Sequence, residues 1–593
     1  MIMEDSVHHP PQSETEVYAT ARTRPTVIVP LEVGKNMSRS LRHQWITHDV
    51  KRTTGENARQ ANIDAGNAVA TALRSTLGPS GRDKMLVGAN GTVIVTNDGA
   101  SILDRMAIDD PAARMIARAA NAQHETIGDG VTTTVLLIGE LLSQAERLVN
   151  DGLHPTTILK GYDRATSYAL QRSDEYRIDI TSKDDERLRA VAKTAVTGRW
   201  GPKATDRFST LTTAAVRAGD RATRTETSAI TTKAFPGGER RDSERIDGIL
   251  VDMDTSSTTI ELFDTDSPST LTDARIALVD AEIDIEQPDT VDRMTISTPE
   301  QLDSLHEYES DSTRKIVQTL TDLGVDVLFC QKSIDDAVRT GLAREGVLAV
   351  ERTRRDEFDA LVRATAATAV QSLTDLDRTA IGIVGSIERR SAGSTDLLVV
   401  AGLSGDEHTS LLLRGGTKHV AAETERIIES CLAVVRGALR NGGVLPGGGA
   451  TETALSTDLS KHATTIGGRE QLAIEAFASS LERIPRTLID NAGRDPREVL
   501  PRLRQRHIDT PVIGIDSSTG ELRDMLEAGI LEPTVVKRHC LTTALETTTT
   551  ILRIDDILRH TDTDSSDATT SDDQRSQRRT RQRTGGYPWA IGH

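Results

Sequence analysis

The sequence of 593 residues has only three cysteines and few aromatic residues. Cys330, Cys431 and Cys540 lie far apart, which excludes a Cys-x-x-Cys metal pair and the disulfide framework of a small secreted domain. Aromatic residues make up only 3% of the chain, so its cores must be built from Leu, Val, Ile and Ala. The hydrophobic content of 37% is enough for several such cores.

Long hydrophobic runs are also missing. No segment approaches the ~18 consecutive apolar residues that a bilayer-spanning helix needs. The first residues, "MIMEDSVHHPPQSETEVYAT", have neither the basic nor the apolar region of a secretory signal. These absences predict a soluble, cytoplasmic protein with no membrane partner.

Positive charge is in deficit, because 89 acidic residues face 71 Lys and Arg, for a net charge of −18. An ordinary acidic cytosolic protein is one interpretation. The other, which the plentiful Asp and Thr and the excess of Arg over Lys favour, is a salt-adapted (halophilic) protein kept soluble by acidic charge. Both interpretations disfavour a general nucleic-acid-binding surface.

The two ends of the chain lack hydrophobic periodicity. Residues 1–51 are polar and carry four prolines, which predicts a mostly disordered extension. Residues 561–593 form a low-complexity tail, first acidic and then rich in arginine. A solvated flexible tail is the favoured interpretation, ahead of a cavity-facing or partner-binding element, and nucleic-acid binding is the least favoured.

Between these ends, two stretches with helical periodicity flank a different insert. At roughly 150 residues per domain the length allows three or four domains. Within 248–376, "GILVDMD", "ARIALVDA", "DVLFCQ" and "GVLAVER" are typical of short buried strands alternating with helices. The pattern predicts one domain built from both chain ends, with an α/β domain inserted into it.

One helix inside the insert is predicted to project from it. In "TPEQLDSLHEY" the pattern indicates a capping box, with Thr298 at the N-cap, Pro299 at N1 and Gln301 at N3. The residues that follow are charged and few are apolar. A helix of this composition is not expected in a core.

The stretch "TIGDGVTTTVLLIGEL" at 126–141 combines a glycine turn with the start of a helix. Free backbone N–H groups and the helix dipole make such a turn an anion site. Thr132 and Thr133 would add hydroxyl donors. Asp129 fits beside phosphate only if a hard cation such as Mg²⁺ lies between them. Alone, the motif also describes a simple capped helix start.

Three other loops accompany it: "STLGPSGRDKML" at 75–86, "VTNDGA" at 95–100 and "LPGGGATE" at 445–452. Each could be a simple turn, but their joint order and spacing could not. With these loops the chain resembles the group II chaperonins, the archaeal thermosome family. "GLHPTTILKGY", "LLLRGGTKHV", "IPRTLIDNAGRDP" and "STGELRDMLEAGILEP" carry the same resemblance, which runs from about residue 52 to 560.

The resemblance implies a multi-domain α+β fold with three domains. These are a mainly helical, discontinuous equatorial ATP-binding domain (52–152 and 444–560), a small discontinuous intermediate hinge domain (153–247 and 377–443), and an inserted α/β apical substrate-binding domain (248–376). The charged helix at 298–309 matches the family's helical protrusion. The resemblance also implies a double ring, homo-oligomeric or built with paralogous subunits, that folds unfolded polypeptides using ATP and Mg²⁺.

Carried over residue by residue, the resemblance implies a nucleotide site. Its implied binding residues are Thr76, Leu77, Gly78, Pro79, Asn97, Asp129, Gly130, Val131, Thr132, Thr133, Arg199, Gly448 and Glu532. Asp129 is the implied Mg²⁺ ligand, and Asp98 helps to position the attacking water. Arg199 stands where the family has a lysine that senses the γ-phosphate, and it keeps the charge but not the geometry.

The chain departs from the family pattern at three positions. Ser430 stands where the family has a second aspartate, which orients or deprotonates the attacking water. A serine hydroxyl cannot hold that proton, and loss of a general base costs about 10²–10⁴-fold in rate. Glu429 is the nearest replacement, but it lies about 100° around the helix. Val131 deletes a hydroxyl from the phosphate loop, and Ser80 deletes a lysine.

These departures leave three hypotheses open. The chain is an active chaperonin subunit, or a structural or regulatory subunit that binds ATP but hydrolyses it poorly in a mixed ring, or a free-standing binding protein. The client proteins and ring symmetry are not readable from the sequence.

Overall fold

The structure is a computed structural model, which describes residues 50–88, 91–222, 230–253, 270–285, 299–393, 395–403 and 408–560. The predicted disordered extension (1–51) lies outside the described residues up to residue 49, but its last two residues belong to strand β1 (Val50–Thr54), so the prediction is wrong for residues 50 and 51. The C-terminal tail and the N-cap Thr298 lie outside the described residues. The chain divides into two units: Thr54–Asp556, and a terminal unit that contains all but one residue of β1 and of β18 (Asp556–His560), which pair in a two-stranded sheet.

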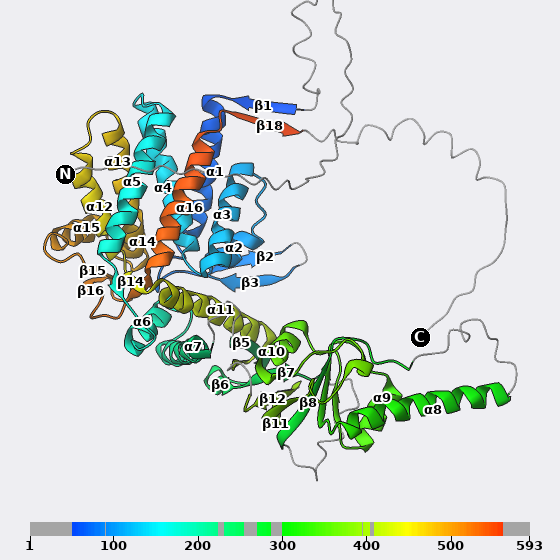
Figure 1. Cartoon of the computed structure of the whole chain (residues 1–593). Helices are drawn as coiled ribbons and strands as arrows, with labels where there is room; N and C mark the ends of the chain where they lie inside the picture. Colours follow the sequence, from blue (N-terminus) through cyan, green and yellow to red (C-terminus); the bar gives the residue numbers. More distant parts are fainter. Residues whose placement is uncertain are drawn as a thin grey trace, which may run out of the picture. The chain divides into compact units, whose positions relative to one another are not determined.

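The first core of the large unit is helical and is built from both ends of the chain (Figure 1). The N-terminal segment supplies α1 (Glu56–Arg74), α3 (Pro111–Ile127), α4 (Val131–Asn150) and α5 (Pro155–Glu175). The C-terminal segment supplies α12 (Ala450–Ala463), α13 (Glu470–Leu481), α14 (Arg483–Asn491), α15 (Pro496–Arg506) and α16 (Thr534–Leu552). Helices from both chain ends thus share one hydrophobic core.

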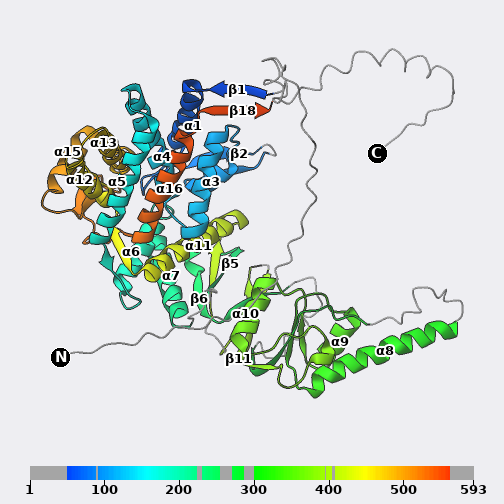
Figure 2. The ribbon, with the colours of Figure 1, turned by 45° about the horizontal axis from the view of Figure 1, so that its top comes forward.

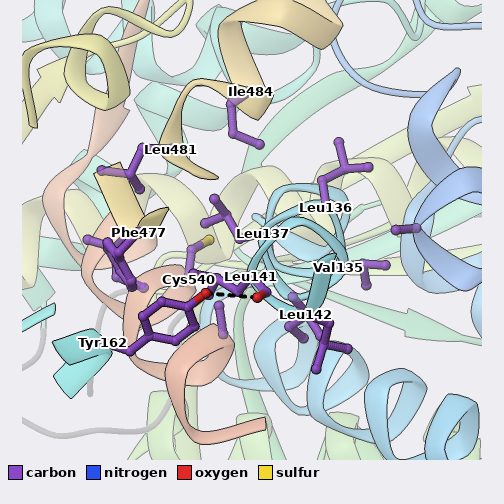
Figure 3. Close-up of a cluster of buried hydrophobic side chains, with 14 of the residues drawn as sticks. Val135, Leu136, Leu137, Leu141, Leu142, Tyr162, Phe477, Leu481, Ile484 and Cys540 are labelled. Atoms are coloured by element: carbon purple, nitrogen blue, oxygen red, sulfur yellow. Dashed lines mark hydrogen bonds between the residues drawn. The ribbon is translucent and has the colours of Figure 1, made fainter. Parts of the chain in front are cut away.

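Helix α4 lies at the centre of this core (Figure 3). Leu136, Leu137 and Leu141 are almost fully buried, because apolar residues occupy nearly its whole circumference. The core has few rings, but Tyr162 and Phe477 meet edge to face with centroids 5.7 Å apart, and the Tyr162 hydroxyl donates to the Leu141 carbonyl oxygen at 2.9 Å. The core therefore holds the middle of α4 in place.

A second core joins helices to a small sheet. It contains α6 (Asp185–Ala195), α7 (Pro202–Ala222), α11 (Lys418–Asn441) and the sheet β5–β13–β6, whose strands are Ile230–Pro236, Thr409–Gly415 and Glu244–Asp247. The predicted apolar face of α11 is confirmed, since Ile427, Ile428, Cys431, Leu432 and Val435 are buried in this core.

The insert is a six-stranded sheet in the order β10–β9–β8–β11–β12–β7. Its strands are β7 (Ile249–Asp252), β8 (Thr270–Val279), β9 (Val327–Cys330), β10 (Leu348–Val350), β11 (Gly382–Ala392) and β12 (Thr395–Ala401). All four predicted strands are present. The sheet also takes β11 and β12, so it continues beyond residue 376, where the alternation of strands and helices had placed its end.

Both faces of this sheet are covered, which explains why its central strands are continuously apolar. Along β9, Val327 and Phe329 pack on the side of α10 (Arg355–Thr365), while Leu328 and Cys330 pack on the side of α8 (Pro299–Asp322) and α9 (Asp336–Arg344). All three cysteines of the chain are buried and unpaired, as their spacing predicted.

Helix α8 begins at Pro299 and is longer than the sequence suggested. None of the residues 303–319 is buried, and Leu320 is the first to be. Figures 1 and 2 both show its N-terminal end extending away from the six-stranded sheet. The helix therefore projects, as its charged composition indicates.

No helix in the described part of the chain is long and apolar enough to cross a bilayer.

Candidate nucleotide site

A cavity of about 490 Å³ lies where the helical core meets the second core. That volume is typical of sites for small ligands. Every residue that the sequence analysis placed in the nucleotide site lines this cavity, including Asp98 and Ser430. The structure thus brings together four loops that are separated by up to some hundreds of residues in the chain.

The start of α4 forms one wall. Its N-cap, Gly130, has φ +86°, and no side chain caps the helix. The first backbone bond runs from the Thr134 N–H to the Gly130 carbonyl oxygen, so the three preceding N–H groups are not used by the helix. Three free donors at the positive end of a helix dipole form an anion site.

Glycine is required in this turn. A Cβ on Gly130 would lie 2.6 Å from the Cys540 sulfur, and one on Gly128, which has φ +84°, would lie 2.8 Å from the Ala433 Cβ. Both positions also have a backbone conformation that L-residues rarely adopt. Any side chain would therefore displace the turn from the cavity.

Helix α2 (Gly99–Arg105) brings a second N-terminus to the same cavity. It follows the hairpin of β2 (Lys84–Val87) and β3 (Val93–Thr96). A Cβ on Gly99 would lie 2.6 Å from Thr132 Oγ1, so this glycine allows the two helix starts to converge.

Asp129 is a half-buried carboxylate that forms no ion pair with a cation of the described residues. Its Oδ1 accepts the Gly130 N–H at 2.6 Å. Burial raises the pKa of Asp129, and the charges of Lys537 and Arg199 offset this only in part. A carboxylate without a cationic partner fits a hard divalent cation, which would favour its charged form.

The described residues contain no cluster of three or more His, Cys, Asp and Glu side chains suited to a metal ion. A cation at Asp129 would therefore take its other ligands from phosphate oxygens and water. Mg²⁺ tolerates this arrangement, since it dehydrates reluctantly and is commonly held by one or two carboxylates.

Asp98 is the opposite case, because both of its oxygens are paired. It caps α2 by accepting the Ser101 N–H at 2.8 Å, and it forms ion pairs with Arg199 at 3.1 Å and Arg426 at 2.7 Å. Burial alone would raise the pKa of Asp98, but Arg426, Arg199 and the Ser101 N–H outweigh burial and hold that pKa below its usual value. Arg199 also contacts Asn97.

Ser430 faces the cavity from α11, and its hydroxyl donates to the Arg426 carbonyl oxygen at 3.1 Å. Glu429 does not line the cavity, and its carboxylate accepts a hydrogen bond from Thr232 Oγ1 of β5 at 3.0 Å. The side chain nearest in sequence to Ser430 that could replace a lost aspartate is thus held on a different face of the helix.

The other two departures have structural consequences. Val131, at the first position of α4, is buried with the core and lines the cavity with methyl groups. Ser80 does not line the cavity, and its hydroxyl donates to the Ser517 carbonyl oxygen at 2.5 Å. It ties the 75–86 loop to the loop after β15 (Ile513–Asp516), which does line the cavity.

The opposite wall is formed by the glycine turn that follows β14 (Gly443–Pro446) and by β17 (Leu531–Pro533). Gly448 has φ +60°, and a Cβ there would lie 2.7 Å from the Ile515 carbonyl oxygen. Gly78 has φ +81°, and a Cβ there would lie 2.6 Å from the Leu488 side chain. Backbone and aliphatic side chains can thus approach a flat ligand closely on this side.

Two residues that sequence reasoning missed are prominent in the cavity. Lys537 is buried in α16 and lies between Glu532, at 2.6 Å, and Glu452. Burial disfavours its ammonium group, but the two carboxylates outweigh burial and raise the pKa of Lys537. A lysine within the apolar "PTVVKRH" was the available signal. The second missed residue is Arg426, which the sequence could have indicated by its position one helical turn before Ser430.

Comparison with known proteins agrees with this geometry. Residues 69–562 match the TCP-1/cpn60 chaperonin family. The chain is 41% identical over 515 residues to thermosome subunit alpha of Halobacterium salinarum, covering 86% of this chain and 90% of the relative. It is 41% identical over 511 residues to thermosome subunit 1 of Haloferax volcanii, with the same coverage, and 39% identical over 513 residues to thermosome subunit alpha of Thermoplasma acidophilum, covering 86% and 92%.

Proposed function

Because this chain belongs to the TCP-1/cpn60 chaperonin family, we propose that it is a thermosome-like subunit that binds ATP with Mg²⁺, assists the folding of other proteins and hydrolyses ATP slowly. The observation that carries the proposal is the cavity itself. It offers the uncapped N-terminus of α4 and the half-buried carboxylate of Asp129, which has no cationic partner among the described residues, while Ser430 occupies the place of a proton acceptor.

Each part of the ligand has a complementary part of the cavity. The uncapped start of α4 and the hydroxyls of Thr132 and Thr133 suit the phosphates, with the cation on Asp129. Gly78, Leu77 and Gly448 suit the nucleoside, and Glu532 suits the ribose hydroxyls. Arg199 supplies a cation near Asp98 for the terminal phosphate.

Hydrolysis requires a proton acceptor. A water oxygen must bond to the γ-phosphorus while the bond to the bridging oxygen breaks, giving ADP and phosphate, and the water loses a proton. Asp98 is paired with two arginines, Asp129 suits the cation, and Glu429 bonds to Thr232. Ser430 can position the water by a hydrogen bond but cannot take its proton, so the reaction is expected to be slow.

We propose an equatorial domain (52–175 and 444–560), an intermediate domain (about 176–247 and 402–443) and an apical domain, with the projecting α8 as a lid element and unfolded polypeptides as substrates. The packing of α5 in the helical core supports extending the first equatorial segment from residue 152 to Glu175. The six-stranded sheet supports moving the end of the apical domain from 376 to about 401. The subunit is expected to assemble into a cytoplasmic double ring, alone or with paralogues, and the halophilic relatives support adaptation to salt.

Calorimetric titration with MgADP tests the binding proposal independently of hydrolysis. The wild type should bind, and Asp129→Asn should weaken binding in Mg²⁺ but much less in EDTA, because only the cation-dependent part is lost. Equal binding by both proteins in Mg²⁺ would remove Asp129 from the site. Electron microscopy that showed only monomers, with and without ATP and salt, would contradict the ring.

A further inference from the structure

Arg426 of α11 lines the cavity and forms ion pairs with two carboxylates, Asp98 and Glu423. Its Nη1 donates to Asp98 Oδ2 at 2.7 Å. On its other side, Nη2 donates to Glu423 Oε1 at 2.7 Å and Nε donates to Glu423 Oε2 at 3.1 Å. This two-pronged pairing fixes the plane of the guanidinium group. Glu423 itself lies outside the cavity lining.

Arg199 approaches the same carboxylate differently. It comes from the connection between α6 and α7, and its Nη2 donates to Asp98 Oδ1 at 3.1 Å. Its other contact is the neutral amide of Asn97. Among the described ion pairs, Arg199 has one carboxylate partner, while Arg426 has two.

The two oxygens of Asp98 are therefore not equivalent. Oδ2 accepts both the helix-capping N–H of Ser101 and the guanidinium of Arg426. Oδ1 accepts the guanidinium of Arg199. If a phosphate attracts one arginine away, the cheaper one to move is Arg199, since Arg426 would have to break a bidentate pair as well.

We propose that Arg426, backed by Glu423, is a positioning residue for ATP hydrolysis that holds Asp98 in place while Arg199 transfers from Asp98 to the terminal phosphate. This inference rests on the proposed nucleotide site. Transfer of Arg199 frees Oδ1 to accept a hydrogen bond from the attacking water. Arg426 keeps Oδ2 and the start of α2 where they are, so the geometry of attack does not depend on the arginine that moves.

The proposal predicts a division of labour between the two arginines. The test compares Arg426→Gln and Arg199→Gln by kcat and KM for ATP and by calorimetric binding of MgADP, all in the Ser430→Asp parent. Arg426→Gln should lower kcat about 10- to 100-fold, since a small misplacement of reacting groups has effects of this size. The affinity of Arg426→Gln for MgADP should stay within about 2-fold of the parent's affinity, because the variant loses no contact with the bound nucleotide. Arg199→Gln should mainly raise KM.

Glu423→Gln provides a second variant that changes no cavity residue. It should lower kcat in the same direction as Arg426→Gln but less, because the arginine keeps its contact with Asp98. Arg426→Lys should recover only part of the rate, since an ammonium cannot bridge both carboxylates in the same geometry. The matched control on the same helix is Glu429→Gln, which should leave kcat unchanged.

An unchanged kcat in Arg426→Gln, or a rise in KM equal to that of Arg199→Gln, would overturn the role of Arg426. A loss of rate in Glu429→Gln as large as in Glu423→Gln would also overturn it, because the effect would then be a general one of α11. If the parent binds no MgADP, the proposed nucleotide site itself fails, and the role of Arg426 fails with it.

Discussion

Replacing Ser430 with aspartate should raise the rate of ATP hydrolysis. The side chain at position 430 lies on α11 facing the cavity, one turn beyond Arg426 and beside the glycine turn at Gly128. Aspartate at this position would add a carboxylate that, unlike Asp98, is not already paired with arginines. It would supply a proton acceptor on α11, where the wild type has only a hydroxyl.

The size of the effect follows from two opposing terms. A general base contributes about 10²–10⁴-fold, which is about 3–5 kcal/mol of transition-state stabilisation. Against it, the substitution removes the hydrogen bond from Ser430 Oγ to the Arg426 carbonyl oxygen, a cost of about 1 kcal/mol in stability. The new base lowers the activation barrier, whereas the lost hydrogen bond lowers only the free energy of unfolding. The two effects therefore do not cancel, and kcat should rise at least about 100-fold.

The assay is phosphate release at saturating MgATP, with Ser430→Asn as the matched control. Asparagine has the shape of aspartate and can hydrogen-bond water, but it is not basic. The rate should rise in Ser430→Asp and stay near that of the wild type in Ser430→Asn. Equal gains in both variants would show that shape, rather than basicity, limits the wild type. An unchanged rate in both variants would show that a missing proton acceptor at position 430 does not limit hydrolysis.

Two further predictions concern the walls of the cavity. Gly130→Ala should abolish MgADP binding and lower the melting temperature, because φ +86° and the Cys540 sulfur at 2.6 Å both exclude a Cβ, whereas Gly467→Ala, which has open space, should change neither. Lys537→Met should lower the free energy of unfolding by about 3–5 kcal/mol in urea titrations, since it leaves buried carboxylates unpaired. Burial already raises the pKa of Glu532, and losing the ammonium should raise that pKa further, so the protonated form is preferred in the folded state. The loss in Lys537→Met should therefore grow as the pH rises through that pKa and shrink in acid; a loss independent of pH would point to packing instead.

The sequence predicted those parts of the site that lie on local motifs. Gly128, Gly130 and Gly448 need backbone conformations or close approaches that glycine allows, so their loops could be read from the chain itself. The helical periodicity that places Ile428 and Val435 in the core likewise fixed which face of α11 is buried.

The features that the sequence could not show are contacts between segments that lie far apart in the chain. The contact of Arg426 with Asp98 joins residues 328 positions apart, and the contact of Lys537 with Glu452 joins residues 85 apart. Neither has a local signature. For the same reason the antiparallel strands β11 and β12 were not assigned to the sheet, because only their register with β8 and β7 shows it.

A single-turnover experiment on the wild type shows directly whether the cavity binds ATP but hydrolyses it slowly. Labelled MgATP is bound to an excess of protein, and the bound nucleotide is identified over time. We expect the nucleotide bound to the wild type to remain ATP at least about 100-fold longer than the nucleotide bound to Ser430→Asp. Conversion to ADP as fast in the wild type as in Ser430→Asp would contradict this expectation.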